Sequence, residues 1–296
     1  MRTISEIGKT LLIGKGFLGT KLLKIFSNKG ASIASAGIEW GCNAVCDITK
    51  RNPTINLIKK LKPENIILTA SISNVDFCET HQKEAFKVNA KGTKNVADAC
   101  VKTKSRLVFL STDYVFNGNK GNYDEAAPLS PINYYGKTKA EAEKIVKSLQ
   151  DYLIVRPSTL YGFNSIEDKN TFARFVVQKL SEGSEVYITN QITSPTLIDD
   201  LSIAIYSLLK KNCNGVYHCV GAEAMSRIDF AQRISKVFGL ESSKIIFSEK
   251  IPGETARRPQ NSSLSISKIK RQKIHMTGIN EGLKKLKKEV SVAWNT

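Results

Sequence analysis

Residues 10–26 read TLLIGKGFLGTKLLKIF, and this segment is the strongest indication of the fold class. A short apolar strand runs directly into the pattern G-x-G-x-x-G, and an amphipathic helical pattern follows it. In such a turn the first glycine allows the tight bend, the second lets the backbone approach a pyrophosphate, and the third lets helix and strand pack closely. The phosphates then lie at the helix N-terminus, where free N–H groups favour negative charge. The predicted dinucleotide contacts are Gly14, Lys15, Gly16, Phe17, Leu18 and Gly19.

The residues after the second predicted strand bear on which dinucleotide binds. A site that prefers NAD usually places an acid at the end of this strand, where it binds the ribose hydroxyl groups. No acid stands there, although Glu39 follows, and Lys15, with Lys50 or Arg51 farther along, would meet a 2′-phosphate. We therefore expect NADPH, with NADH as a second cofactor. Asp47 is either an acceptor for the adenine amino group or an acid at the start of the next helix.

Working outward from this turn, strand and helix patterns alternate through the first half of the chain. Strands are predicted at residues 10–14, 31–36, 65–70, 106–110 and 153–155, and helices at 20–28, 55–61, 83–102 and 133–149. This alternation predicts a parallel sheet covered by helices on both faces. The fold class is therefore α/β, with a doubly wound, Rossmann-like sheet.

The second half has shorter elements and more turn residues. Helices are predicted at residues 171–181, 197–210 and 227–238, and strands at 185–188 and 215–220. No linker rich in glycine, serine or proline separates the two halves. We expect a dinucleotide-binding domain over residues 1–155, completed by about residues 190–215. Residues 156–189 and 216–296 are expected to form a smaller C-terminal α/β substrate lobe.

Composition excludes several classes of protein. With 296 residues, 41% hydrophobic and 24% charged, the chain is of ordinary globular composition, and it has no run of 18 apolar residues that would span a membrane. Its six cysteines are irregularly spaced, which favours reduced thiols in a cytoplasmic protein, and no metal site is expected. The net charge of +17 comes from dispersed lysines without an aromatic-basic motif. We therefore expect neither nucleic acid nor membrane as a partner, with nucleic-acid binding as the weakest alternative.

Residues 135–139, YGKTK, contain the pattern Y-x-x-x-K. On a helix, Tyr135 and Lys139 would share one face. A free tyrosine has a pKa near 10, and a nearby ammonium favours the phenolate, so the phenol could donate a proton near neutral pH. Thr112 follows the strand RLVFL, at the sheet edge where parallel strands face a ligand, and could hydrogen-bond a substrate carbonyl.

Together these features resemble the extended short-chain dehydrogenase/reductase superfamily and, within it, the dTDP-4-dehydrorhamnose reductase family. The resemblance runs nearly end to end. The motifs that carry it are VDFCE at 75–79, VNA at 88–90, STDYVF at 111–116 before Gly118, SPT at 194–196 with DL at 200–201, and RPQNSSL at 258–264.

The resemblance implies an NAD(P)H-dependent oxidoreductase of dTDP-L-rhamnose biosynthesis that reduces a nucleotide-linked 4-keto-6-deoxy sugar. The implied catalytic set is Thr112, Tyr135 and Lys139. Tyr135 would protonate the sugar C4 oxygen as hydride arrives from the nicotinamide, and Lys139 would also hold the nicotinamide ribose. Further implied cofactor contacts are Asp47, Ile48, Ala70, Ser71, Ser73, Asn89, Tyr135 and Lys139, and implied substrate contacts are Val75, Asp76, Thr112, Arg258 and Asn261. Arg258 would bind phosphate bidentately, with a structural salt bridge as the alternative.

Two departures leave the sugar and its nucleotide open. TAS stands at residues 69–71 where the family often has NAA, and Thr159 stands where the family often has tryptophan. Two other functions remain as alternatives: a nucleotide-sugar 4-epimerase, and a non-catalytic NADP-binding subunit like the regulatory subunit of methionine adenosyltransferase. The chain could also form a homodimer, and the sequence does not determine its oligomeric state.

Overall fold

The computed structural model describes residues 7–165 and 171–294. In this part of the chain a seven-stranded parallel sheet has the order β11-β6-β5-β4-β1-β2-β3. The strands, in sheet order, are β11 (Gly215–His218), β6 (Tyr152–Arg156), β5 (Arg106–Leu110), β4 (Asn65–Leu68), β1 (Thr10–Ile13), β2 (Ile33–Gly37) and β3 (Ala44–Val45). The strand order reverses beside β1, which is the topological switch point of a doubly wound sheet. The predicted fold class is confirmed.

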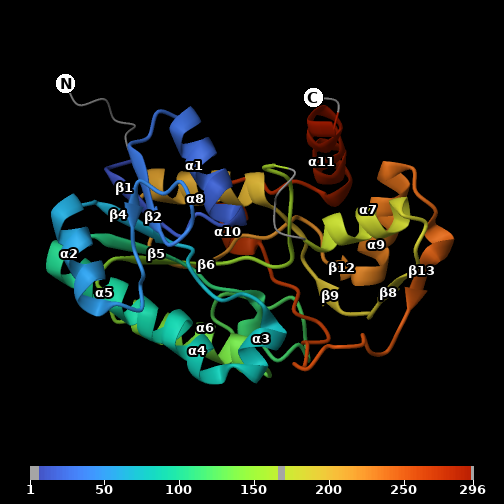
Figure 1. Cartoon of the computed structure of the whole chain (residues 1–296), viewed down its shortest axis with the longest axis horizontal. Helices are drawn as coiled ribbons and strands as arrows, with labels where there is room; N and C mark the ends of the chain where they lie inside the picture. Colours follow the sequence, from blue (N-terminus) through green and yellow to red (C-terminus); the bar gives the residue numbers. More distant parts are fainter. Residues whose placement is uncertain (1–6, 166–170, 295–296) are drawn as a thin grey trace.

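Helices cover both faces of this sheet (Figure 1). One face packs on α1 (Phe17–Asn28) and α8 (Ile198–Lys210), and the other on α2 (Arg51–Leu61), α5 (Thr93–Thr103) and α6 (Tyr134–Lys147). Successive strand residues point to opposite faces, so Leu12 packs in the first layer and Ile13 in the second. Both side chains are fully buried, which explains why these strands are apolar throughout rather than alternating.

The long helix predicted over residues 83–102 is divided in the structure. It consists of α4 (Gln82–Phe86), a π-helical segment, η1 (Lys87–Gly92), and α5. A short helix that the sequence pattern did not predict, α3 (Val75–Thr80), precedes it. The π-helical segment contains Asn89, whose side chain accepts a hydrogen bond from the Ile72 amide outside the helix. The wider turn at this residue breaks the regular α-helical spacing of the predicted helix.

The small lobe lies at one end of the sheet, at the right of Figure 1. Its apolar core lies between α7 (Phe172–Ser181), α9 (Arg227–Phe238) and α11 (Ile279–Trp294). Two of its strands, β8 (Val186–Ile188) and β13 (Ile245–Phe247), pair in parallel. The remaining short elements are η2 (Asp113–Val115), β7 (Leu160–Tyr161), β9 (Ile192–Thr193), β10 (Thr196–Leu197), β12 (Met225–Ser226), η3 (Ser242–Lys244) and α10 (Ser267–Arg271).

The start of the second lobe segment differs from its predicted position. Residues 216–218 belong to β11, which pairs with β6 in the main sheet rather than with the small lobe. The predicted strand at 215–220 was located correctly along the chain, but its periodicity carries no information about which sheet it joins. In the described residues no helix is long and apolar enough to cross a membrane.

Candidate active site

A cavity of about 500 Å³ opens at the carboxyl ends of the central strands, between the sheet and the small lobe. The glycine turn after β1, the loop after β4, the end of β5 and helix α6 form one side. The other side comes from the loop after β6 and from three small-lobe residues, Thr171, Phe172 and Arg227. This is where doubly wound sheets bind their ligands.

The glycine turn is shaped for a group that approaches the backbone. Gly14 has φ +103°, and a Cβ there would lie 2.5 Å from the amide nitrogen of Ala70. A Cβ on Gly19 would lie 2.1 Å from the carbonyl oxygen of Gly14. At Gly16 a Cβ would meet nothing within 4 Å, and no side chain caps the N-terminus of α1. Open space in front of uncapped helix N–H groups fits a pyrophosphate.

The residues expected at the adenosine end are mostly engaged with the protein itself. Lys15 Nζ donates to the Gly41 carbonyl at 2.8 Å, while Glu39 lines the cavity. Asp47 Oδ1 accepts from both the amide and the hydroxyl of Thr49, at 2.9 and 2.7 Å. These bonds correspond to the second interpretation of Asp47, an acid that shapes the turn into α2. Neither Asp47 nor its buried neighbour Ile48 lines the cavity.

The loop after β4 is held against helix α6 by Asn89. Ala70, Ser71 and Ser73 of this loop line the cavity, as expected, but Asn89 does not. Asn89 Oδ1 accepts from the Ile72 amide at 2.8 Å, and its Nδ2 donates to the Ile72 carbonyl at 2.9 Å and to Thr138 Oγ1 at 3.0 Å. The predicted cofactor residue therefore shapes the loop rather than the cavity wall.

Thr112, Tyr135 and Lys139 all line this cavity. Tyr135 and Lys139 lie one helical turn apart in α6, whose N-cap Asn133 accepts from the Gly136 amide at 2.8 Å. Glu79 of the VDFCE motif accepts from the amide of the residue before Tyr135, at 2.8 Å, and so fixes the same helix end. The structure thus brings together the three residues that the sequence selected.

Burial dominates the pKa values of this set. It raises the pKa of the Tyr135 phenol, against a hydrogen bond with Thr112 that lowers it, so the phenol is held in its protonated form. Burial also lowers the pKa of Lys139 to about 7, since its ammonium lies in an apolar site, 4.2 Å from the centre of the Phe109 ring. The lowered tyrosine pKa predicted from the sequence is therefore opposed by desolvation: burial keeps the proton on the phenol and makes the phenol a weaker acid than a free tyrosine.

A buried carboxylate, Asp113, which was not among the predicted site residues, lies next to Thr112. Thr112 Oγ1 donates to Asp113 Oδ1 at 3.0 Å, while the hydroxyls of Ser158 and Ser262 donate to Asp113 Oδ2 at 2.7 and 2.6 Å. Burial raises the pKa of Asp113, against these three bonds that lower it. An acid adjacent to a predicted site residue at a buried strand end was the available signal. Asp113 fixes the rotamer of Thr112 and ties it to the RPQNSSL segment.

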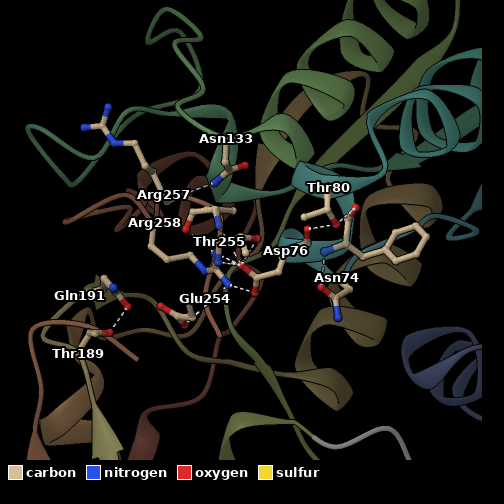
Figure 2. Close-up of polar contacts among 12 residues, drawn as sticks. Asn74, Asp76, Thr80, Asn133, Thr189, Gln191, Glu254, Thr255, Arg257 and Arg258 are labelled. Carbon is tan, nitrogen blue, oxygen red and sulfur yellow. Dashed lines mark hydrogen bonds and ion pairs between the residues drawn. The ribbon is translucent and has the colours of Figure 1, made fainter. Parts of the chain in front are cut away.

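Of the expected substrate contacts, Val75 and Thr112 line the cavity, and Asp76, Arg258 and Asn261 do not. Asp76 and Arg258 bind each other instead, with Oδ2 to Nη2 at 2.6 Å and Oδ1 to Nη1 at 3.1 Å (Figure 2). Asn261 Oδ1 accepts from the Ser263 hydroxyl at 2.7 Å. The structural salt bridge, given above as the alternative for Arg258, is the arrangement in this structure.

Arg227 and Phe172 also line the cavity, although no sequence pattern pointed to them. The Arg227 guanidinium carbon lies 4.5 Å from the centre of the Phe172 ring. Both residues line the main cavity and an adjoining cavity of about 320 Å³, called the outer cavity below. Arg227 is the first residue of a helix that was predicted correctly, but nothing in its spacing identified it as a site residue. An arginine and an aromatic ring between two cavities can bind a phosphate and an apolar or planar group.

Comparison with known proteins identifies similar chains. The family model described as RmlD substrate binding domain matches residues 8–292. A dTDP-4-dehydrorhamnose reductase from Aggregatibacter actinomycetemcomitans is 31% identical, over 89% of this chain and 92% of the relative. Methionine adenosyltransferase 2 subunit beta from Danio rerio is 27% identical, over 86% of this chain and 81% of the relative.

The solved structures include a dTDP-4-dehydrorhamnose reductase from Bacillus anthracis str. Ames in complex with NADP. It superposes with a TM-score of 0.87 at 29% identity, over 95% of this chain and 99% of that chain. Its sheet and small lobe therefore share the arrangement described above.

Proposed function

We propose, from the premise that the chain belongs to the RmlD substrate binding domain family, that it reduces a nucleotide-linked 4-keto-6-deoxy sugar with NADPH. It is an NADP-dependent oxidoreductase of the dTDP-4-dehydrorhamnose reductase type. The observation that carries the proposal is the meeting of Thr112, Tyr135 and Lys139 with the glycine turn on one cavity. The turn fits the pyrophosphate of the cofactor for two reasons: there is open space beside Gly16, and no side chain caps the N–H groups at the start of α1.

Each residue of the catalytic set has a defined role in the reaction. NADPH, when bound, supplies hydride to the sugar C4 carbon. Tyr135 donates its phenolic proton to the C4 oxygen, and the Thr112 hydroxyl, positioned by Asp113, hydrogen-bonds the same oxygen. The Lys139 ammonium stabilises the phenolate that proton transfer leaves behind. We assign the sugar nucleotide's phosphates to Arg227, since this guanidinium lies between the two cavities.

The decisive experiment is an assay of dTDP-4-dehydrorhamnose reduction, followed by the loss of NADPH absorbance, with NADH run in parallel. Turnover with either cofactor supports the reductase, and the ratio of the two kcat/KM values fixes the cofactor preference. Tight NADPH binding without turnover would instead favour the NADP-binding subunit, which the likeness to methionine adenosyltransferase 2 subunit beta keeps as the second candidate. The cytoplasmic location, the lack of a nucleic-acid partner and the homodimer stay expectations, the last to be tested by sedimentation.

Two glycine variants should separate cofactor binding from folding. Gly16→Ala should leave the thermal unfolding midpoint nearly unchanged, because its Cβ meets no protein atom, but it should weaken NADPH binding about tenfold by occupying the pyrophosphate space. Gly19→Ala should destabilise the fold by about 1–3 kcal/mol, since its Cβ would overlap the Gly14 carbonyl oxygen. Thermal unfolding and NADPH titration of both proteins check this. Equal effects of the two variants on both measurements would contradict it.

Lys139→Met should lose activity and gain stability. The folded pKa of about 7 lies below the ordinary value of 10.5, so between these values the unfolded chain binds a proton that the folded chain does not. The buried ammonium of Lys139 therefore lowers the free energy of unfolding most below pH 7. This destabilisation decreases as the pH rises from about 7 to 10.5. We expect kcat to fall by about 10²–10⁴-fold. Without bound NADPH, the variant should be more stable than wild type by the largest amount near pH 6, and this difference should vanish toward pH 10. A variant less stable than wild type at pH 6 would contradict the sign.

A further inference from the structure

Asp76 and Arg258, 182 positions apart in the sequence, join the sheet domain to the small lobe (Figure 2). Besides the two bonds to Arg258, Asp76 Oδ1 accepts from the backbone amides of Thr255 and Ala256 at 2.8 and 3.0 Å. One carboxylate at the start of α3 thus holds both the side chain and the main chain of the 254–258 segment.

The ion pair between Asp76 and Arg258 is largely buried and is held by additional hydrogen bonds. The Arg258 side chain is only 10% exposed, and its Nη1 also donates to the Ala256 carbonyl at 2.7 Å. Burial alone would raise the pKa of Asp76, but the bonds from Arg258, Ala256 and Thr255 outweigh it and hold that pKa well below its usual range. The carboxylate is therefore ionised at neutral pH. The planar guanidinium makes two parallel bonds, a geometry that lysine cannot reproduce.

Both ends of the contact lead to the cavity walls. On the sheet side, α3 begins with Val75, which lines the main cavity, and its Glu79 fixes the N-terminus of α6. On the lobe side, the Arg257 carbonyl accepts from Asn133 Nδ2 at 2.9 Å, so the segment also contacts the N-cap of the catalytic helix. Glu254, in the same segment, lines the outer cavity. A displacement of the segment would therefore alter the wall of the outer cavity.

We propose that Asp76 and Arg258 form an interlobe latch that positions the 254–258 segment as the wall of the outer cavity, and that both are positioning residues for the nucleotide end of the substrate. This inference rests on the proposed function for its substrate. It gives the VDFCE and RPQNSSL motifs a shared role, because the two motifs bind each other across the lobes. Neither side chain needs to touch the substrate.

The latch differs in a measurable way from direct phosphate binding by Arg258. If Arg258 served the phosphates, Asp76 would compete for it, and Asp76→Asn would leave the guanidinium only its longer ion pair with Glu254, at 3.7 Å, and its bond to the Ala256 carbonyl, and would tighten substrate binding. If the latch is correct, Asp76→Asn and Arg258→Gln should act alike. Each should raise KM for dTDP-4-dehydrorhamnose about tenfold, the scale of one lost charge-assisted bond. We expect kcat within about threefold of wild type and an unchanged Kd for NADPH, because α6 and the glycine turn keep their other contacts.

The double variant Asp76→Asn/Arg258→Gln should be no worse than Arg258→Gln alone, since both lack the bonds between Asp76 and the guanidinium. Asp98→Asn is the matched control, because Asp98 also pairs with an arginine, Arg51, but on the surface away from the cavity. Amide hydrogen exchange at Thr255 and Ala256 should accelerate in Asp76→Asn but not in this control. This exchange readout needs no turnover, so it tests the latch even if the reductase assay fails. Unchanged exchange, or a KM that falls in Asp76→Asn, would overturn the latch.

Discussion

Tyr135→Phe should lower kcat for the keto-sugar by about 10²–10⁴-fold, the contribution expected of a positioned general acid. The change removes one oxygen and leaves the aromatic ring, which packs edge-to-face on Tyr114 with ring centres 6.3 Å apart. The structure holds this phenol protonated in a buried site beside the Thr112 hydroxyl, and the other phenol of α6, Tyr134, has Thr138 rather than a lysine four residues later. The loss should therefore fall on the chemical step.

The matched control is Tyr134→Phe, because this neighbouring phenol is not among the residues that line the cavity. It should keep kcat within about twofold. Both variants should bind NADPH as wild type does, since the glycine turn is untouched. If Tyr135→Phe retained kcat, the proton would have to come from another group, and Thr112 would be the first to replace. If it lost NADPH binding instead, its role would be to hold the cofactor.

The sequence best predicts those parts of the molecule whose conformation is set by residues close together in the chain. A buried strand followed by G-x-G-x-x-G leaves little conformational choice, because Gly14 needs a positive φ and Gly19 has no room for a side chain. Likewise Tyr135 and Lys139 share a face because a helix places residues four apart together. Local spacing therefore predicted the fold class and selected the glycine turn, Tyr135 and Lys139, which line the cavity.

What the sequence could not predict depends on contacts between distant segments. Asp76 and Arg258 both belong to recognised motifs, and both were expected at the substrate, but their partners are each other. Asp113 is bonded by Ser158 and by Ser262, which are 45 and 149 positions away in the sequence. Spacing indicates which face of an element a side chain occupies, whereas the neighbour on that face is set by tertiary packing.

Removal of Glu143 should produce the largest loss of stability of the changes considered. Glu143 and Arg156 are both fully buried, and they make two parallel bonds, Nε to Oε1 at 2.8 Å and Nη2 to Oε2 at 2.7 Å. The Ser111 hydroxyl also donates to Glu143 Oε1 at 2.6 Å, so this carboxylate ties α6 to the ends of β5 and β6. Glu143→Ala leaves a buried guanidinium without its counter-charge, which costs about 3–5 kcal/mol. Urea unfolding measures this as a lower free energy of unfolding.

The same ion pair also allows a test of why the loss occurs. The cost should come mainly from the charge left unpaired, so Glu143→Met/Arg156→Met should recover most of the stability that Glu143→Ala loses. Glu141→Ala, which breaks an exposed pair with Lys144 on the same helix, should cost less than about 1 kcal/mol. Because Glu143 lies one turn after Lys139 and bonds the residue before Thr112, the double variant should also lower kcat although its fold is restored. If Glu143→Met/Arg156→Met were as unstable as Glu143→Ala, the lost stability would come from the hydrogen bonds of Glu143 rather than from the unpaired charge of Arg156.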